Sequence, residues 1–248
     1  MVIGQQKTVL ITGASEGIGR ATAKAFAAKG ANLILVARNR ERLLGLAQEL
    51  KNDSIKVDVH TADFQKESEV DNFFQNVGFY DIAINNAGFE GKIGEITELE
   101  TSDYQEVFNV NVRAVLQCLK QEVKHFRSRK IKGSIVNVSS IAGFKGISHS
   151  SIYVASKHAV LGLTRAVAIE QIAHGIRVNC VSPGATDTAM LRRILGHQID
   201  ELIKRQPNGK LVQPEDIAKT ILWLSNDDAE HVVGQDIVVD GGKTVMLP

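Results

Sequence analysis

A tyrosine and a lysine, Tyr153 and Lys157, stand four residues apart in a segment with helical periodicity. That spacing places both side chains on one face of a helix. A free phenol has a pKa of about 10, and bringing it to neutrality needs roughly 4 kcal/mol of phenolate stabilisation. An ammonium ~6 Å away supplies only about 3 kcal/mol at an effective dielectric of ~20. The pair therefore predicts proton transfer by the phenol, provided that a second positive charge, such as an oxidised nicotinamide, lies nearby.

Two serines, Ser139 and Ser140, follow the expected strand Ser134–Val138. The carboxyl end of such a strand is the edge at which open α/β sheets bind ligands. A hydroxyl there can donate a hydrogen bond to a carbonyl oxygen that gains negative charge. Two histidines, His149 and His158, flank the tyrosine, and we expect both to be ordinary polar residues.

A glycine-rich segment, Thr12–Gly19, lies between the first expected strand and the first expected helix. Glycines allow a sharp turn that approaches a pyrophosphate closely, and free N–H groups at a helix start favour an anion. The spacing Gly-x3-Gly-x-Gly differs from the usual Gly-x-Gly-x-x-Gly, so a purely structural turn is the alternative. The alternating α/β pattern that follows favours nucleotide binding.

The second expected strand ends at Ala37, and Arg38 follows it. An acidic residue at such a position holds the ribose hydroxyls of NAD, whereas a guanidinium can pair with a 2′-phosphate. The sequence thus favours NADP(H), with NAD(H) possible because Glu16 places a negative charge in the glycine turn. A solvated Arg38 is a further alternative.

These residues need a scaffold, and apolar runs of strand length alternate with helical patterns along the chain. The expected strands are Thr8–Thr12, Leu33–Ala37, Ile55–His60, Ile82–Ile84, Ser134–Val138, Arg177–Val181 and Asp236–Val239. The expected helices are Ile18–Ala28, Arg40–Leu50, Ser102–Arg127, Ile152–Ile172 and Pro214–Leu224. Strands that are apolar on both faces and separated by helices indicate a covered parallel sheet. We predict one α/β domain over residues 1–248, a Rossmann-like doubly wound parallel sheet with helices on both faces.

Residues 183–213 interrupt this alternation because they contain no expected strand. A helical pattern inside them has an apolar face formed by Met190, Leu191, Ile194, Leu195, Ile199, Leu202 and Ile203. Long segments of this kind are usually functional, so we expect a substrate lid at about residues 186–212. A structural helical hairpin is the alternative. The apolar face predicts a moderately apolar pocket for a small to medium substrate.

Composition excludes several classes. Lys+Arg number 29 and Asp+Glu 28, a net charge of +1, which gives no electrostatic reason to expect nucleic acid or a membrane as partner. The two cysteines, Cys118 and Cys180, are too few for a disulfide scaffold, and we expect buried thiols. No histidine or acidic cluster has metal-ligand spacing. No uninterrupted apolar run approaches the ~20 residues of a membrane span, so we expect a cytoplasmic protein.

Together the motifs resemble those of the short-chain dehydrogenase/reductase family over essentially the whole chain. The matching motifs are Thr-Gly-x3-Gly-x-Gly at 12–19, Asn-Asn-Ala-Gly at 85–88, the helix asparagine Asn111, Tyr-x3-Lys at 153–157, and a Pro-Gly turn at 183–184 with Thr188. The family serine lies thirteen residues before the tyrosine, and 153 − 13 = 140 selects Ser140 over Ser139.

The resemblance implies roles for individual residues. Tyr153 would exchange a proton with the carbonyl or alcohol oxygen, Ser140 would polarise that oxygen, and Lys157 would hold the nicotinamide ribose. Asn111 would anchor a water that relays protons. The positions implied to bind the cofactor are Gly13, Ser15, Glu16, Gly17, Ile18, Gly19, Arg38, Asp63, Phe64, Asn86, Ala87, Gly88, Tyr153, Lys157, Pro183, Gly184, Thr186 and Thr188.

The sequence therefore predicts an NADP(H)-dependent oxidoreductase that acts on a small-molecule carbonyl compound or secondary alcohol. A dinucleotide-binding sensor or scaffold without turnover is the alternative from another class. The resemblance also implies a homotetramer or dimer, formed through the helices that contain Asn111 and Tyr153.

Overall fold

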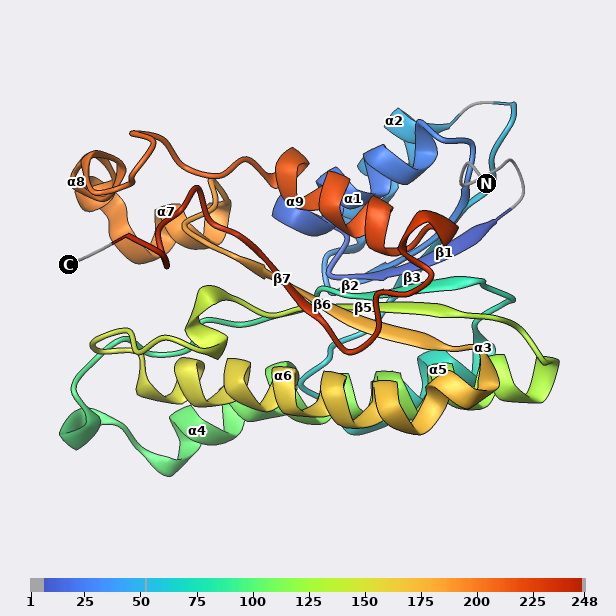
Figure 1. The fold of residues 1–248 in the computed structure, drawn as a ribbon, viewed down its shortest axis with the longest axis horizontal. Helices are drawn as coiled ribbons and strands as arrows, with labels where there is room; N and C mark the ends of the chain where they lie inside the picture. Colours follow the sequence, from blue (N-terminus) through green and yellow to red (C-terminus); the bar gives the residue numbers. More distant parts are fainter. Residues whose placement is uncertain (1–6, 52, 247–248) are drawn as a thin grey trace.

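The computed structural model describes residues 7–51 and 53–246. Seven parallel strands form one sheet in the order β3-β2-β1-β4-β5-β6-β7 (Figure 1). The strands are β1 (Thr8–Thr12), β2 (Asn32–Ala37), β3 (Val57–Thr61), β4 (Ile82–Asn85), β5 (Ser134–Val138), β6 (Arg177–Pro183) and β7 (Asp236–Val239). The strand order reverses between β1 and β4. Sheets of this type bind ligands at this place, beside the carboxyl ends of the strands.

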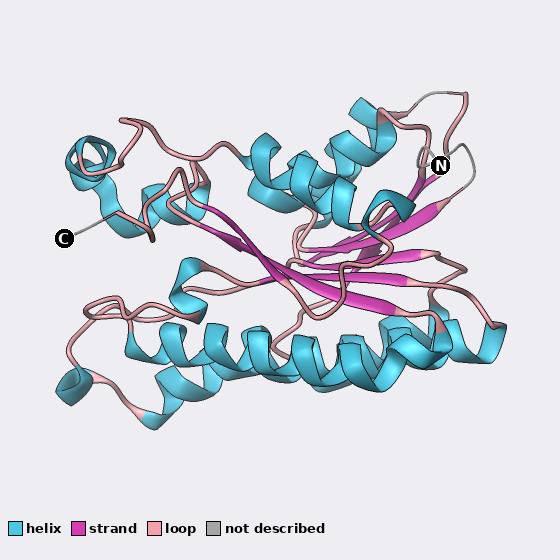
Figure 2. Cartoon of the chain, in the orientation of Figure 1, coloured by secondary structure: helices cyan, strands magenta, loops and turns pink. Residues whose placement is uncertain are grey.

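Helices cover both faces of the sheet, as Figure 2 shows. One face carries α1 (Gly17–Ala27), α2 (Arg40–Leu50) and α9 (Pro214–Leu224), and the other carries α3 (Glu67–Asn76), α4 (Thr101–Phe108), α5 (Ala114–Arg129) and α6 (Ser151–Gln171). A hydrophobic core lies on each face. Cys118 and Cys180 lie in the core beneath α5 and α6 as buried free thiols, as predicted. The predicted fold class is confirmed.

Two helical predictions differ from the structure. Helix α3 was not expected, because only Val70 and Phe73 of its ten residues are buried and its apolar pattern is short. The single helix expected over Ser102–Arg127 is instead α4, a π-helical turn η2 (Asn109–Arg113) and α5. Such turns interrupt α-helices most often at functional sites, and the periodicity of apolar residues does not reveal them.

Two strand boundaries also move by two residues, and one boundary each of β2, β3 and β4 moves by one. The strand expected to start at Ile55 starts at Val57, because Ile55 forms only an isolated bridge after a turn. Strand β6 continues two residues beyond the expected Val181, to Pro183, where it still pairs with β7.

The segment between β6 and α9 contains two short helices, α7 (Ala189–Leu195) and α8 (Ile199–Lys204), joined by the 3₁₀ turn η5 (Gly196–Gln198). It projects beyond the end of the sheet, at the left of Figure 1. An isolated parallel bridge between Thr186 and Val212 closes its base. The two ends of the predicted lid are therefore held together while its helices extend away from the core.

Helix α6 with the 3₁₀ turn η4 (Ile172–His174) is long and apolar enough to cross a membrane by length and composition alone, with a hydropathy of 1.2. Its sequence contains no long uninterrupted apolar run, because Lys157, His158 and Arg165 lie within it. Its inner face packs on the sheet through residues such as Val160 and Ala168, which belong to a hydrophobic core. Because core helices of globular proteins pass the same test, we interpret α6 as a core helix whose outer face is apolar.

Candidate active site

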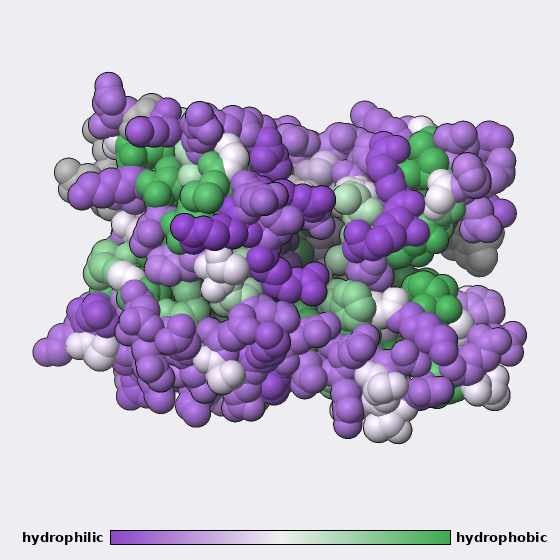
Figure 3. All heavy atoms as spheres, turned by 180° about the vertical axis from the view of Figure 1, so that it is seen from behind, coloured by the Kyte–Doolittle hydropathy of each residue, from purple (hydrophilic) through white to green (hydrophobic). Residues whose placement is uncertain are grey.

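A groove of about 640 Å³ lies at the carboxyl ends of the central strands. It runs from the end of β2, past the glycine turn, to Tyr153 and Lys157 on α6, with α7 on its outer side. Figure 3 shows apolar side chains on both sides of the hollow at the right of that view. The sequence predicts both ends of this groove, and the fold brings them together.

The glycine turn lets a ligand come close to the protein backbone. Gly13 has a φ of +64°, and a Cβ atom there would lie 2.9 Å from the Cα atom of Ala87. A Cβ atom on Gly19 would lie 2.3 Å from the carbonyl oxygen of Gly13. The N-cap residue of α1, Glu16, makes no capping hydrogen bond, so the first N–H groups of the helix remain available to an anion. These features fit the pyrophosphate of a dinucleotide.

The Asn-Asn-Ala-Gly segment holds the glycine turn in place. The hydroxyl of Thr12 accepts hydrogen bonds from the N–H groups of Asn86 and Ala87, both at 3.0 Å. The side-chain amide of Asn86 donates to the carbonyl oxygens of Thr12 and Gly13, both at 3.1 Å. Both amide hydrogens of Asn86 are thus used within the protein, and this residue shapes the groove rather than donating to a ligand.

The far end of the groove carries two arginines. Arg38 lines it as predicted, and Arg42, which the sequence analysis did not select, lies one helical turn further along. Arg42 forms an ion pair with Glu16 from the glycine turn. The adjacent groove residues, Asp63 and Phe64, lie after β3, where the Asp63 carboxylate accepts the N–H of Gln65 at 3.0 Å.

Tyr153 and Lys157 meet at the other end of the groove. The ammonium of Lys157 lies 5.6 Å from the centre of the Tyr153 ring and donates to the carbonyl oxygen of Val138 at 3.1 Å. Burial lowers the pKa of Lys157 to about 8. Burial also raises the pKa of Tyr153 to about 12, against a hydrogen bond with Ser140 that lowers it, and the charge of Glu90 adds to the rise. In the free protein the phenol is therefore less acidic than an ordinary tyrosine, because burial outweighs the hydrogen bond with Ser140. The predicted acidification needs a second positive charge beside Lys157 and stays a prediction.

The two serines occupy different places. Ser140 forms a hydrogen bond with the Tyr153 side chain and accepts the N–H of Ala142 at 3.1 Å. Ser139 is buried and donates to the carbonyl oxygen of Lys157 at 3.0 Å. Ser140 is therefore the serine beside the phenol, as the thirteen-residue spacing implies, although Ser139 also lines the groove.

Asn111 lies within the π-helical turn and is buried. Its amide nitrogen donates to the carbonyl oxygen of Phe89 at 2.9 Å and to the hydroxyl of Ser156 at 3.0 Å. Its amide oxygen accepts the N–H of Phe89 at 2.8 Å. These hydrogen bonds fix the Phe89 loop against the π-helical turn. The relay water that the resemblance implies at Asn111 stays a prediction.

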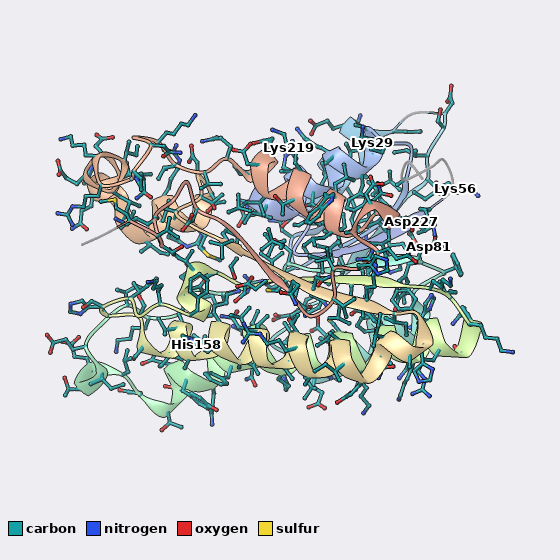
Figure 4. All side chains as sticks on the ribbon, viewed as in Figure 1. Lys29, Lys56, Asp81, His158, Lys219 and Asp227 are labelled. Carbon is teal, nitrogen blue, oxygen red and sulfur yellow. The ribbon has the colours of Figure 1, made fainter. Side chains whose placement is uncertain are left out.

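The histidine that follows Lys157 takes no part in this arrangement. His158 is exposed on α6 (Figure 4), and its ring lies 2.9 Å from the carbonyl oxygen of Val154, one turn earlier in the same helix. This agrees with the expectation of an ordinary polar residue.

Comparisons with known proteins decide the family. A family model described as enoyl-(acyl carrier protein) reductase matches residues 13–244. The chain is 36% identical to an A-factor type gamma-butyrolactone 1′-reductase of Streptomyces virginiae over 247 residues, 97% of this chain and 96% of the relative. The chain belongs to the short-chain dehydrogenase/reductase family. It is therefore an oxidoreductase that acts on alcohol or carbonyl groups with a nicotinamide cofactor.

Solved structures of this family share the whole fold. Levodione reductase superposes with a TM-score of 0.92 at 33% identity, covering 97% of this chain and 98% of that one. A variant actinorhodin polyketide ketoreductase solved with NADPH superposes with a TM-score of 0.88 at 31% identity, covering 96% and 97% of the two chains. The resemblance that the motifs indicated thus extends to the backbone.

Some positions implied by the dehydrogenase/reductase motifs lie outside the groove lining. Pro183, Gly184 and Thr186 form the base of the segment between β6 and α9, where Thr186 donates to the carbonyl oxygen of Gly184 at 3.0 Å. Gly19, Asn111 and Ser140 are not among the lining residues either, although Ser140 lies beside the Tyr153 side chain. Thr188 does line the groove and caps α7 by accepting the N–H of Leu191 at 3.2 Å.

The sequence did not indicate the other lining residues of this dehydrogenase/reductase: Asn39, Arg42, Phe89, Glu90, Val110, Val138, Ala189 and Arg193. Ala37 and Met190 also line the groove, and the sequence placed them only at a strand end and on the apolar face of the lid. Arg42 had a usable signal, since it is four residues after Arg38. The pairing of Glu90 with Arg193 had none, because the two residues are 103 positions apart.

Proposed function

We propose that this enzyme uses NADP(H) to transfer a hydride to or from the carbonyl or secondary alcohol of a small to medium, moderately apolar substrate. The observation that carries the cofactor choice is the pair of arginines, Arg38 and Arg42, at the end of the groove beside β2. The residue that ends this strand is Ala37, where an NAD-binding protein would place a carboxylate.

Two guanidinium groups suit a 2′-phosphate, since each presents a planar array of donors to phosphate oxygens. The charge of Glu16 opposes this because its carboxylate occupies Arg42 in the structure. A bound phosphate would compete with Glu16 for Arg42, whereas the neutral hydroxyl of NAD(H) would not. NAD(H) remains the alternative that this ion pair favours.

Thermal unfolding with NADPH or NADH tests the choice. We expect NADPH to raise the melting temperature more than NADH at the same concentration, because the ligand with the lower Kd stabilises the folded state more. A ligand at 100 times its Kd stabilises by about 2.7 kcal/mol. Glu16→Gln should strengthen the NADPH effect and Arg42→Met should weaken it. Arg40→Met, on the exposed side of the same helix, should leave it unchanged. Equal stabilisation of the unaltered protein by both cofactors would contradict the proposal.

The residues of the site suit proton transfer in step with the hydride that a bound nicotinamide supplies. A pKa of about 12 keeps the Tyr153 hydroxyl protonated at neutral pH, ready to protonate the oxygen of a carbonyl during reduction. Ser140, which is hydrogen-bonded to that hydroxyl, is placed to donate to the same oxygen. Lys157 lies on the same helix face and is placed to contact a ribose while its charge favours the phenolate formed after transfer.

The lining around this end supports a moderately apolar substrate. Phe89, Val110 and Met190 line the groove, and Met190 comes from the predicted lid. The alternative, a sensor without turnover, is less well supported because Tyr153, Lys157 and Ser140 are all present and adjacent.

We also propose that the protein is a cytoplasmic homo-oligomer. In the single chain, large apolar side chains are exposed on the outer faces of α5 and α6, with Leu116 50% exposed and Ile169 78% exposed. Contact between copies would remove such surface from water.

A further inference from the structure

A carboxylate and a guanidinium meet at the edge of the groove, near the phenol. Oε1 of Glu90, in the loop after β4, accepts a hydrogen bond from Nε of Arg193 in α7 at 2.7 Å, and a second nitrogen of Arg193 lies 2.7 Å from the same oxygen. Both side chains line the groove that contains Tyr153. The other oxygen, Oε2, is buried and has no hydrogen-bond partner among the residues that the structure describes.

The loop that carries Glu90 is fixed on both sides of that residue. Phe89 is held through both its N–H and its carbonyl oxygen by Asn111. Gly91 has a φ of +73°, and a Cβ atom there would lie 2.3 Å from a methyl group of Val107 on α4. The Glu90 side chain itself is 11% exposed. The loop that carries Glu90 is therefore fixed, and its buried Oε2 reaches a ligand in the groove through a rotation of the carboxylate.

An acceptor in this state discriminates between ligands. A buried polar atom without a partner is costly, and a ligand that donates to it recovers that cost. A ligand of the same shape that lacks the donor leaves the atom unpaired, which is why sites built to bind a hydroxyl reject analogues without it. Because the two nitrogens of Arg193 occupy Oε1, Oε2 is the oxygen left for the ligand.

We propose that Oε2 of Glu90 accepts a hydrogen bond from a second hydroxyl of the substrate, beyond the alcohol or carbonyl group that reacts. The inference rests on the proposed function, because it places the reacting oxygen at Tyr153 and Ser140. The substrate class is then a diol or hydroxyketone on a small and otherwise apolar skeleton. Glu90 determines specificity, and Arg193 positions its carboxylate.

The test compares kcat/KM for oxidation of cyclohexanol with that for the 1,2-, 1,3- and 1,4-cyclohexanediols, at saturating NADP+ and, in parallel, NAD+. We expect at least one diol to exceed cyclohexanol by about 10- to 100-fold, the range that one recovered buried hydrogen bond corresponds to. Glu90→Leu removes the acceptor and should bring this ratio close to one. Glu90→Gln keeps an acceptor oxygen and should retain part of the preference.

A matched control lies on the same helix. Arg192 forms two hydrogen bonds with Asp187, at 2.7 and 2.9 Å, and neither residue lines the groove. Arg192→Met therefore weakens an ion pair of α7 without touching Glu90 and should leave the diol-to-cyclohexanol ratio unchanged. The NADPH-induced rise in melting temperature of each variant shows that it is folded.

Two results would overturn the inference, and they differ. If the unaltered enzyme oxidises cyclohexanol and the diols equally well, or if Glu90→Leu lowers all of them by the same factor, Glu90 only fastens α7 and the inference alone fails. If none of the alcohols and none of the corresponding ketones is turned over with either cofactor, the proposed oxidoreductase site fails and the inference fails with it.

Discussion

Tyr153 carries the chemistry of the site, and its surroundings in the free protein favour the protonated phenol. Burial and the charge of Glu90 raise its pKa to about 12, and burial lowers the pKa of Lys157 to about 8. The two shifts have one cause, since a buried site disfavours any charge. A positively charged nicotinamide would add the charge that the site lacks and would favour the phenolate required for alcohol oxidation.

Replacing Tyr153 by Phe tests this role at a single hydroxyl. We expect kcat to fall by about 10²- to 10⁴-fold, the usual contribution of a general acid or base, because the variant lacks the proton donor. The melting-temperature rise caused by NADPH should persist, since the ring still fills its place. Steady-state turnover by NADPH absorbance and thermal unfolding measure the two effects. A variant with turnover within tenfold of the unaltered enzyme would refute the role.

A second buried acid lies behind the site. Glu122 on α5 is fully buried, and its Oε2 accepts a hydrogen bond from the amide of Asn85 at 3.1 Å. The same amide donates to Asn137 at 3.0 Å, and Asn85 directly precedes the Asn86 that holds the glycine turn. Burial raises the pKa of Glu122 to about 8, so the carboxyl is mostly neutral at pH 7.

This shift predicts a loss of stability with rising pH. The folded protein holds the Glu122 proton more tightly than the unfolded chain, so the stabilisation is complete below pH ~4.5 and disappears as pH rises to about 8. At about 1.4 kcal/mol per pKa unit, the full change is roughly 5 kcal/mol. Glu122→Gln cannot ionise and should flatten this dependence. Urea unfolding at pH 5 and pH 8 measures it.

Glu170→Gln is the control for this prediction, because Glu170 is exposed on α6 and its replacement should leave the slope as in the unaltered protein. Parallel slopes for Glu122→Gln and the unaltered protein would mean that Glu122 is already ionised in the folded state at pH 5.

At the scale of elements, the site depends on two turns that are hydrogen-bonded to each other. The turn between β1 and α1 and the loop after β4 are joined by the four hydrogen bonds between the Thr12–Gly13 backbone or hydroxyl and the Asn86–Ala87 segment. The π-helical turn η2 adds a third contact by placing Asn111 against the same loop. These contacts lie beside the groove. A substitution that moves the two turns apart should therefore weaken cofactor binding before it affects other properties.

Gly19→Ala tests that close approach. Its Cβ atom would lie 2.3 Å from the carbonyl oxygen of Gly13, so the turn must shift. We expect the NADPH-induced rise in melting temperature to disappear under conditions in which the unaltered protein gains about 2.7 kcal/mol. Gly45→Ala, in α2 with no atom within 4 Å of the added methyl, should keep the NADPH effect and gain up to about 1 kcal/mol of stability. Normal NADPH binding by Gly19→Ala would contradict this account.

At the scale of the whole molecule, the sheet places every functional segment at one edge. The loops that follow β1, β2, β4 and β5 all open there, and α7 covers it from the far side of β6 (Figure 1). The outer faces of α5 and α6, which point away from the sheet, take no part in the groove and are free to contact another copy of the chain. Their exposed apolar side chains support the proposed oligomer and explain why so apolar a helix as α6 is only partly covered in the single chain.

Ile169→Lys tests this assembly. A lysine at this position, where the isoleucine is 78% exposed, would bury a charge in any interface between copies and should shift the protein toward monomers. Ile96→Lys is the control, since Ile96 is 70% exposed in η1 (Ile96–Glu98), at the far end of the molecule. Light scattering coupled to size exclusion measures the mass. An unaltered protein that elutes as a monomer would refute the proposed assembly.

The sequence by itself determined the class of fold, most of the elements, and which residues would meet at Tyr153. Alternating apolar runs, glycine positions and the spacing of Ser140, Tyr153 and Lys157 are local patterns, and local patterns decide strands, turns and helix faces. The same patterns predicted the glycine turn and Arg38. They did not show α3, whose apolar pattern is short, or the π-helical turn, which changes no residue type.

Only the tertiary structure decided how the charges of the site are arranged. Glu16 faces Arg42, Glu90 faces Arg193, and Glu122 is buried behind Asn85, each pair joining segments that are far apart in the chain. The sign of the shift in the pKa of Tyr153 was also decided there, because burial outweighed the hydrogen bond with Ser140. Burial and long-range pairing depend on how elements pack, and electrostatic energies depend on distance and local dielectric, which the order of residues does not specify.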